Sequence, residues 1–263
     1  RIDMKLSVVI PFYNEENMIQ KMYDELVKEI NQITKAEFEI IFINDGSKDR
    51  TFERMLAIAA GDSRVKYISF SRNFGKEAGT IAGLEYATGE AVILMDGDLQ
   101  HPPAMLPQMI EAYEQGYDVV SARRTRTGEK PHRTFLAKHF YKLANKMMDI
   151  ELMDGVSEFR LFSRKVVNAI ISMQEYNRFS KGIFAWIGFN EKVIEYENQV
   201  RTVGETKYSL KFSLNYAIQG ILSFNDKPLR MCINFGLFCL LISLAYVLWT
   251  FVQYFVAPDS LVS

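Results

Sequence analysis

The sequence predicts an α/β fold, in which helices flank a mostly parallel sheet and a membrane-spanning helix follows. Three observations support this fold class. Short, continuously apolar segments alternate with helix-length segments through the first half of the chain, as in parallel sheets whose strands are buried on both faces. Polar turns follow three of the apolar segments, and a long uncharged segment stands near the C-terminus.

Strands and helices are expected to alternate regularly over the first half of the chain. The expected strands are residues 6–12, 38–44, 65–70, 91–96 and 118–122. The expected helices are residues 17–33, 51–60, 76–87 and 103–115, the last beginning at a proline. Beyond Arg123 the pattern loosens into a polar stretch (125–134), a helix (135–148), a strand (158–163), a helix (164–173) and a half-exposed strand (191–200).

The composition excludes several classes of protein. The 263 residues are enough for one large domain, or a domain with an appendage, and 48% of them are hydrophobic, so a packed core is expected. The net charge of -1 gives no overall basic field, which argues against a nucleic-acid partner. Both cysteines, Cys232 and Cys239, lie in one apolar segment, so there is no disulfide framework or Cys/His metal site.

No charged residue occurs between Met231 and Pro258. About 20 apolar residues cross a bilayer, so we predict a transmembrane helix over 231–258 rather than a buried core helix. Lys227 and Arg230 precede this span, and basic flanks tend to stay in the cytoplasm. We therefore expect a catalytic domain on the cytoplasmic face of the inner or plasma membrane. A second span could be missing from this chain.

An amphipathic segment lies between the expected domain (1–208) and the span. Apolar residues recur at three- and four-residue spacing over 209–224, which predicts a juxtamembrane helix within 209–230. Two alternatives remain open: the helix packs on its own domain, or it lies in the plane of the lipid headgroups.

Polar residues that could carry chemistry follow the ends of the first, second and fourth expected strands. Ligands of open α/β sheets bind at these carboxyl ends. Asp96 and Asp98 follow the fourth strand, and two crowded carboxylates favour a hard divalent ion such as Mg²⁺ or Mn²⁺. The alternative is a turn with two solvated aspartates. No glycine-rich dinucleotide or P-loop motif follows any strand.

Seven ordered motifs together resemble a known family. They are VVIPFYNEEN, INDGSKDRT, SFSRNFGKEAGTIAGLEYATGE, VILMDGDLQHPP, VVSARRTRTGE, EFRLFSR and VRTVGETKYS. They resemble the inverting glycosyltransferases of family 2, which have the GT-A fold. Within that family, the polyprenyl-phosphate branch of bactoprenol glucosyltransferases and dolichyl-phosphate mannose synthases is the most similar. The resemblance covers roughly residues 5–230.

The resemblance implies a nucleotide-sugar site along the first two strands. Pro11, Tyr13 and Glu15 would line the nucleoside pocket, and Asp45 would accept a hydrogen bond from the base. Asp96 would contribute to donor binding as well as to the metal.

The metal and catalytic residues also follow from the resemblance. Asp96 and Asp98 match the metal and diphosphate motif, and Gln100 would be a further metal ligand. His101 is expected to have a structural role. Glu158 stands where relatives carry the residue proposed to activate the acceptor. It is expected to act as a base or to orient Arg160 or the acceptor, and these alternatives stay open.

Basic residues are expected to bind phosphate, because arginine forks suit phosphate oxygens. Arg123, Arg201 and Lys207 are the candidates on the donor side. Arg133 and Arg160 are candidates for the acceptor or its phosphate. Two further residues in SRNFGKEAG, Arg72 and Lys76, are expected to contact a substrate, with no role assigned.

The resulting hypothesis is a metal-dependent, inverting transfer of a hexose, with glucose from UDP-glucose favoured, to a polyprenyl phosphate such as undecaprenyl phosphate. Relatives assemble through their membrane segments, so a homo-oligomer is also expected. Two alternatives remain. The first is a membrane-bound transferase that acts on a hydroxyl of a glycolipid or polysaccharide. The second is an inactive scaffold for membrane partners, which the intact Asp96 and Asp98 disfavour.

Overall fold

The computed structural model describes residues 4–125, 145, 155–173, 180–197 and 227–256. Within these ranges the chain forms one seven-stranded sheet in the order β3-β2-β1-β4-β6-β5-β7. The strands are β1 (Met4–Phe12), β2 (Ala36–Asn44), β3 (Val65–Ser69), β4 (Ala91–Leu94), β5 (Val119–Arg124), β6 (Val156–Ser163) and β7 (Glu191–Tyr196). The predicted helices at 135–148 and 209–230 fall almost entirely outside the described residues.

The sheet is parallel except for one strand. Parallel pairing joins β1 to β2, β1 to β4, β2 to β3 and β5 to β7. β6 runs antiparallel to both β4 and β5. The prediction of a mostly parallel sheet is confirmed. Because β6 is reversed, its first residues lie at the edge where β1, β2, β4 and β5 end, which we call the carboxyl edge.

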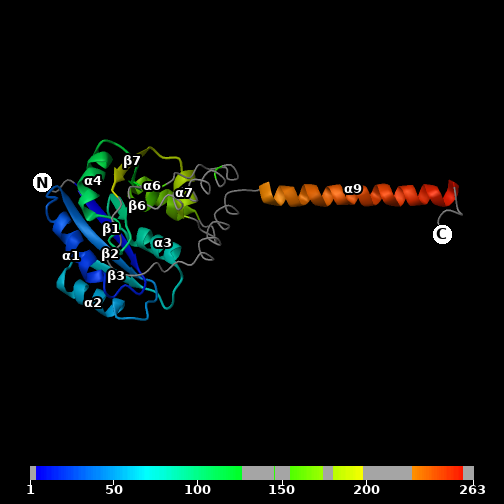
Figure 1. The fold of residues 1–263 in the computed structure, drawn as a ribbon. Coiled ribbons are helices and arrows are strands. Elements are labelled where there is room, and N and C mark those ends of the chain that lie inside the picture. Colours follow the sequence, from blue (N-terminus) through cyan, green and yellow to red (C-terminus); the bar gives the residue numbers. More distant parts are fainter. Residues whose placement is uncertain (1–3, 126–144, 146–154, 174–179, 198–226, 257–263) are drawn as a thin grey trace.

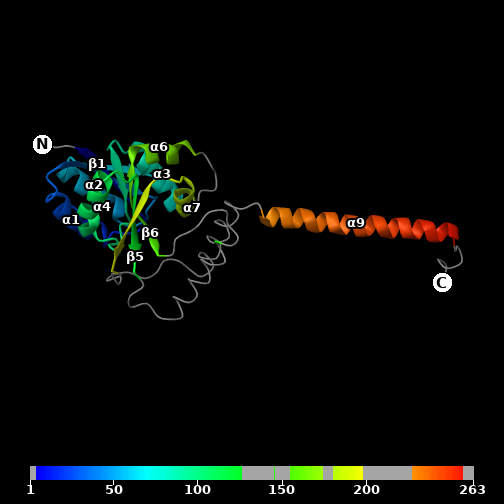
Figure 2. The same cartoon turned by 90° about the horizontal axis from the view of Figure 1, so that it is seen from above.

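Helices cover both faces of the sheet, as Figures 1 and 2 show. One face carries α1 (Ile19–Ile30), α2 (Thr51–Gly61), the short 3-10 turn η1 (Pro103–Met105) and α4 (Leu106–Glu114). The other carries α3 (Lys76–Tyr86), α6 (Arg164–Ser172) and α7 (Ser180–Trp186). Each face has its own buried apolar cluster, so the strand residues alternate between two cores.

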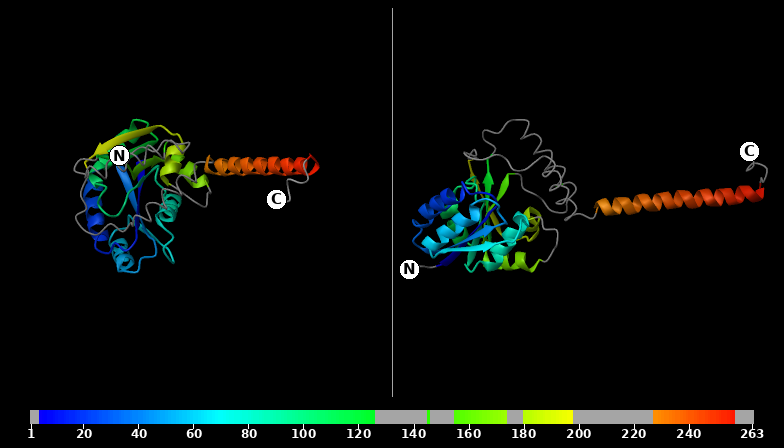
Figure 3. Two further views of the ribbon diagram at one scale, coloured as in Figure 1. Left: turned by 45° about the vertical axis from the view of Figure 1, so that its right-hand side comes forward. Right: turned by 90° about the horizontal axis from the view of Figure 1, so that it is seen from below.

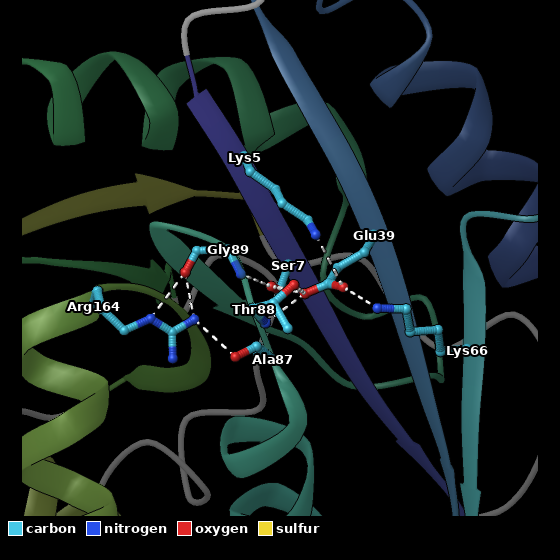
Figure 4. A network of polar contacts seen from close by, with 8 residues as sticks. All are labelled: Lys5, Ser7, Glu39, Lys66, Ala87, Thr88, Gly89 and Arg164. Atoms are coloured by element: carbon cyan, nitrogen blue, oxygen red, sulfur yellow. Dashed lines mark hydrogen bonds and ion pairs between the residues drawn. The ribbon is translucent and has the colours of Figure 1, made fainter.

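A polar network ties the strands together at the opposite edge, away from the carboxyl edge (Figure 4). Glu39 of β2 is only 3% exposed. It accepts hydrogen bonds from Ser7 Oγ (2.6 Å) and Thr88 N (2.6 Å), and it pairs with Lys66 Nζ at 2.6 Å. Burial alone would raise the pKa of Glu39, but these hydrogen bonds outweigh it and lower the pKa to about 2.

A single long helix, α9 (Lys227–Val256), extends away from the domain in every view of Figures 1, 2 and 3. Within Leu229–Val256, the most apolar stretch of 18 residues has a mean hydropathy of 2.2, and none of that stretch is buried against the domain. Exposing so many apolar side chains to water would be unfavourable. By length and composition α9 is a candidate membrane span, as predicted.

Candidate active site

The loops after β1 and β2 are joined by hydrogen bonds. The backbone N–H of Asn14 donates to Ser47 Oγ (3.0 Å), and that of Glu15 donates to Thr51 Oγ1 (2.8 Å). Lys48 N donates in return to Asn14 Oδ1 at 2.8 Å. These bonds hold Asn14 at a positive φ of 52°, a conformation that asparagine tolerates better than most residues. Two predicted nucleoside-pocket loops therefore form one unit.

The residues predicted to line the nucleoside pocket lie at this unit. Pro11 is the second-to-last residue of β1 and pairs with Ile43 of the neighbouring strand β2. Tyr13 follows the strand and is 37% exposed. The Glu15 side chain is half-buried. The structure thus brings these residues to the carboxyl edge, where the sequence placed them.

Asp45, at the end of β2, holds the loop that leads into α3. Its carboxylate accepts the backbone N–H groups of Phe74 (2.7 Å) and Gly75 (3.0 Å) and the Asn73 side-chain amide (2.9 Å). Asp45 is 3% exposed. Burial raises the pKa of Asp45, and the two backbone hydrogen bonds oppose that rise. In this structure the carboxylate predicted to bind the base binds this loop.

The loop after β4 carries the two aspartates of the predicted metal site. The backbone N–H of Asp96 donates to Nδ1 of His101 (3.1 Å), and that of Gln100 donates to Asp98 Oδ1 (3.1 Å). Leu99 between them has a φ of 59°. That conformation is strained for a leucine by roughly 1–3 kcal/mol, and such strain is common at functional sites.

His101 has the structural role expected from the sequence. It is 5% exposed, and its ring stacks on Phe159 of β6 with centroids 5.3 Å apart. Burial lowers the pKa of His101 although Asp96 opposes the shift. The ring is therefore neutral at pH 7, and Nδ1 can accept the Asp96 N–H.

Gly97 lets the Asp96–Asp98 loop lie directly on the core. A Cβ at this position would stand 2.2 Å from Cε1 of Phe12. Phe12 is 2% exposed and packs edge-on against Phe42 with centroids 5.2 Å apart, so its ring has little room to move. The loop that carries both aspartates thus rests on an immobile aromatic ring.

Lys76, the first residue of α3, lies between two carboxylates of the site. Its Nζ is 2.5 Å from Asp96 Oδ1 and 2.6 Å from Glu158 Oε2. Burial alone would lower the pKa of Lys76, but Asp96 and Glu158 outweigh it and raise the pKa well above the ordinary value. The ammonium group therefore joins the loop after β4 to the start of β6.

Arg160 lies deeper along β6 than Glu158. It is 5% exposed, and its guanidinium donates to Glu191 Oε1 (3.2 Å) and to the Ser157 carbonyl (3.4 Å), 5.1 Å from the Phe184 ring centroid. The prediction that Glu158 orients Arg160 stays a prediction: Glu158 pairs with Lys76, and while burial lowers the pKa of Arg160, the charge of Glu158 raises it. As placed here, Arg160 ties β6 to β7 and α7, so it contributes to packing.

Arg123 is the second-to-last residue of β5 and lies at the carboxyl edge, two strands from the strand that leads to Asp96. Its side chain is 45% exposed and lies 3.6 Å from Glu195 of β7. This exposed ion pair is weak, so the guanidinium can turn to a phosphate. The other predicted basic contacts, Arg133, Arg201 and Lys207, lie outside the described residues.

The residues around Asp96 fit a divalent cation. Mg²⁺ and Mn²⁺ prefer oxygen ligands, and Asp96 and Asp98 supply carboxylates from one short loop. A cationic group, the Lys76 ammonium, already lies on Asp96 Oδ1. Among the described residues no group of three or more acidic, histidine or cysteine side chains could enclose a metal. A bound ion would therefore need further ligands from a substrate.

Sequence reasoning missed two features of this site. It singled out Lys76 without assigning a role, and it did not foresee that Asp45 holds residues 73–75. The segment SRNFGKEAG, with its glycine before a helix, was the available indication. Gly75 has a φ of 92°, which glycine adopts without strain.

Comparisons with known proteins agree with this fold. The model of the family "Glycosyl transferase family 2" matches residues 7–171. The chain is 50% identical over 248 residues to the Bacillus subtilis protein named "Putative glycosyltransferase CsbB", covering 94% of this chain and 75% of the relative. It is 41% identical over 251 residues to the bactoprenol glucosyl transferase of Shigella phage SfX, covering 95% of this chain and 82% of the relative.

Solved structures show the same fold at low identity. A mannosyltransferase of Pyrobaculum calidifontis, solved with GDP-Man and Mn²⁺, has a TM-score of 0.55 at 18% identity over 73% of this chain and 55% of its own. Glucosyl-3-phosphoglycerate synthase of Mycobacterium tuberculosis, solved with Mn²⁺ and UDP-glucose, has a TM-score of 0.54 at 20% identity over 83% and 77%. These likenesses establish the GT-A fold. The chain belongs to glycosyl transferase family 2 and is a glycosyltransferase.

Proposed function

We propose that this enzyme transfers a hexose from a nucleotide sugar to a polyprenyl phosphate at the membrane surface, with inversion at the anomeric carbon. One observation carries the proposal. The 41% identity to a bactoprenol glucosyl transferase covers 95% of this chain, so it must include more than half of the apolar helix α9. Catalytic domain and apolar helix therefore resemble that relative as one unit. The relative's name favours glucose, and UDP-glucose is the donor we propose.

The donor would lie along the ends of β1, β2 and β4. Pro11, Tyr13, Glu15 and Asp45 form the proposed nucleoside side, and Asp96 and Asp98 would hold Mg²⁺ or Mn²⁺ with Gln100 as a further ligand. A divalent ion held there supplies charge neutralisation for the departing diphosphate. Two carboxylates leave coordination positions for phosphate oxygens, which is how Mg²⁺ is commonly bound.

The acceptor needs little help from a base. The second pKa of a phosphate monoester is near 6, so a lipid phosphate is largely ionised at neutral pH and can attack the anomeric carbon directly. Glu158 has one oxygen held by Lys76, which favours a positioning role for this carboxylate. Arg123, with Arg201 and Lys207, would stabilise the charge of the leaving nucleoside diphosphate.

The candidate membrane helix α9 would hold the active site close to a lipid-linked acceptor. A polyprenyl phosphate keeps its phosphate at the headgroups, so an active site that serves it must lie close to the bilayer. α9 begins at Lys227 with Arg230 in its first turn, and basic residues favour the cytoplasmic side. We propose that the domain lies on the cytoplasmic face of the inner or plasma membrane.

The test is an assay of the full chain in detergent or nanodiscs with radiolabelled nucleotide sugars, undecaprenyl phosphate and either Mg²⁺ or Mn²⁺. We expect a radiolabelled lipid product that depends on the metal and forms best with UDP-glucose. Asp98→Ala should reduce turnover by at least about a thousandfold, because the diphosphate loses its counter-ion. Asp24→Ala, at an exposed aspartate on α1, is the matched control and should keep wild-type turnover.

Two results would overturn the proposal. If no common donor yields a lipid-linked product, the proposal that a polyprenyl phosphate is the acceptor is wrong. If the product forms equally well in a chelator, or if Asp98→Ala retains activity, the metal role of the aspartates is wrong. A product that appears only with a glycolipid or polysaccharide hydroxyl would favour the alternative acceptor class.

A further inference from the structure

We propose that Lys76 is the resident cation of the metal-free site, and that it must leave Asp96 before a divalent ion can bind there. This inference rests on the proposed function, because it assumes that Asp96 and Asp98 hold a metal. It concerns a residue to which neither the sequence motifs nor the relatives' names assign a role.

The Lys76 ammonium group already occupies Oδ1 of Asp96. Lys76 Nζ lies 2.5 Å from Asp96 Oδ1, while Oδ2 lies 3.8 Å from Nδ1 of the buried His101. A Mg²⁺ ion binds a carboxylate oxygen at about 2.1 Å. An ion at Oδ1 would therefore stand against the ammonium group, and two cations so close repel strongly away from bulk water.

The lysine also explains how the site is stable without a metal. Asp96 and Glu158 come from different elements, and the Glu158 side chain is only 11% exposed. Two carboxylates brought together in this way would repel and lose hydration. The ammonium group of Lys76 bonds to both of them. It thus takes the place that a metal ion would otherwise fill, and it holds Glu158 near the reaction site.

The position of Lys76 in the chain connects the metal site to the donor side. It directly follows Gly75, whose backbone N–H is held by Asp45 at 3.0 Å, as is that of Phe74 at 2.7 Å. A nucleotide base that bonds to Asp45 would compete with these backbone groups. Loosening the loop at 73–75 would then free the first residue of α3 to withdraw from Asp96.

This arrangement predicts an order of binding. Without a nucleotide, the lysine opposes the metal, so metal affinity is low. With a nucleotide, the loop shifts and the phosphates supply ligands, so metal affinity rises. Binding energies of two ligands that act on one element are coupled reciprocally. Removing the lysine should therefore strengthen metal binding in the free enzyme and weaken the effect of the nucleotide on it.

The experiment measures Mn²⁺ binding to the full chain in detergent by electron paramagnetic resonance of the free ion, with and without UDP. For Lys76→Met we expect the nucleotide-free Kd for Mn²⁺ to fall at least about tenfold, within the usual range of site coupling. The factor by which UDP tightens Mn²⁺ binding should shrink correspondingly. Lys76→Arg, which keeps the charge, should bind Mn²⁺ within about threefold of wild type.

Two further variants make the result decisive. Lys66→Met removes another lysine that pairs with a buried carboxylate at 2.6 Å, at the opposite edge of the sheet, and it should leave the Kd for Mn²⁺ unchanged. Lys76→Gln carries the same expectation as Lys76→Met if the methionine variant does not fold. Circular dichroism of each variant checks the fold.

The outcomes separate the inference from the proposed function. If wild type binds Mn²⁺ with UDP but Lys76→Met and Lys76→Gln bind it no more tightly than wild type, the inference is wrong and the metal site stands. If Lys66→Met tightens binding equally, the effect is one of net charge and the inference is also wrong. If wild type binds no Mn²⁺ even with UDP, both proposals fall.

Discussion

The contact between Gly97 and Phe12 makes a sharp prediction about the metal loop. Replacing Gly97 with alanine adds one methyl group between Asp96 and Asp98. The backbone of Gly97 is not among the positive-φ positions, so alanine meets no conformational penalty there. The new Cβ would, however, stand 2.2, 2.6 and 2.9 Å from three ring atoms of Phe12. Steric overlap is therefore the whole effect.

The magnitude follows from how little the ring can move. Phe12 is 2% exposed and is braced by Phe42. Overpacking a core of this kind destabilises a protein by about 1–3 kcal/mol. For a domain of this size that is roughly 2–4 °C in Tm for each kcal/mol, or about 2–12 °C in all. If the loop moves instead of the ring, the two aspartates are displaced, and turnover should fall at least about tenfold.

Thermal unfolding by circular dichroism and the lipid-product assay together measure both parts. Gly61→Ala is the control, because its Cβ would meet nothing within 4 Å at the end of α2. It should leave turnover unchanged and be neutral or slightly stabilising. A Gly97→Ala enzyme with wild-type Tm and wild-type turnover would refute the account of how this loop is supported.

Two further predictions concern the scaffold. Glu39→Gln should destabilise the enzyme by about 2 kcal/mol at pH 7, after discounting for the partly exposed lysines. The pKa of Glu39 is lowered from 4.5 to about 2. The difference in the free energy of unfolding between wild type and Glu39→Gln should therefore be complete above pH 4.5 and vanish towards pH 2. Denaturant titrations in which this difference does not shrink as the pH falls would contradict the prediction. Gly83→Ala should destabilise by about 1–3 kcal/mol, since its Cβ would lie 2.2 Å from Val9 Cγ1. Gly79→Ala in the same helix, at 3.5 Å from its nearest neighbours, should be neutral or stabilising, and equal Tm changes for the two variants would count against the packing argument.

The strands and helices of the first half could be predicted because burial imposes a clear pattern on them. The apolar segment at 38–44 became the fully buried end of β2, and the proline at 103 began a 3-10 turn that leads into α4. The expected helix at 76–87 agrees with α3 to within one residue. Local chemistry was sufficient here because each segment is buried on a constant face.

Strand direction and long-range contacts could not be predicted in this way. An apolar strand has the same pattern in either direction, so nothing in EFRLFS indicated that β6 runs antiparallel. The same reversal brings Glu158 to the carboxyl edge. The α7 helix was not predicted at all; it spans seven residues, too few for helical periodicity to stand out.

Site residues that lie close together in the sequence could be predicted, whereas contacts between distant elements could not. Asp96 and Asp98 could be found because they lie only two residues apart in the sequence and follow an apolar strand. The contact between Lys76 and Glu158 joins residues from α3 and β6, and no spacing in the sequence encodes it. Arg160 was assigned to the acceptor side from its motif alone, and that role stays a prediction; its burial and its hydrogen bond to Glu191 are contacts that no spacing in the sequence indicated.

The charges at the carboxyl edge explain why the enzyme would need both a lysine and a metal. Asp96, Asp98 and Glu158 bring three carboxylates to the end of β4 and the start of β6, and Lys76 offsets one of these charges. A nucleotide diphosphate adds more negative charge at the same place, which one ammonium group cannot balance. A divalent ion bound with the diphosphate would offset that charge, and Lys76 would then be able to bind Glu158 or the incoming phosphate. The three carboxylates and one ammonium group leave an excess of negative charge at the site, and a diphosphate that binds together with a divalent ion would leave this excess nearly unchanged.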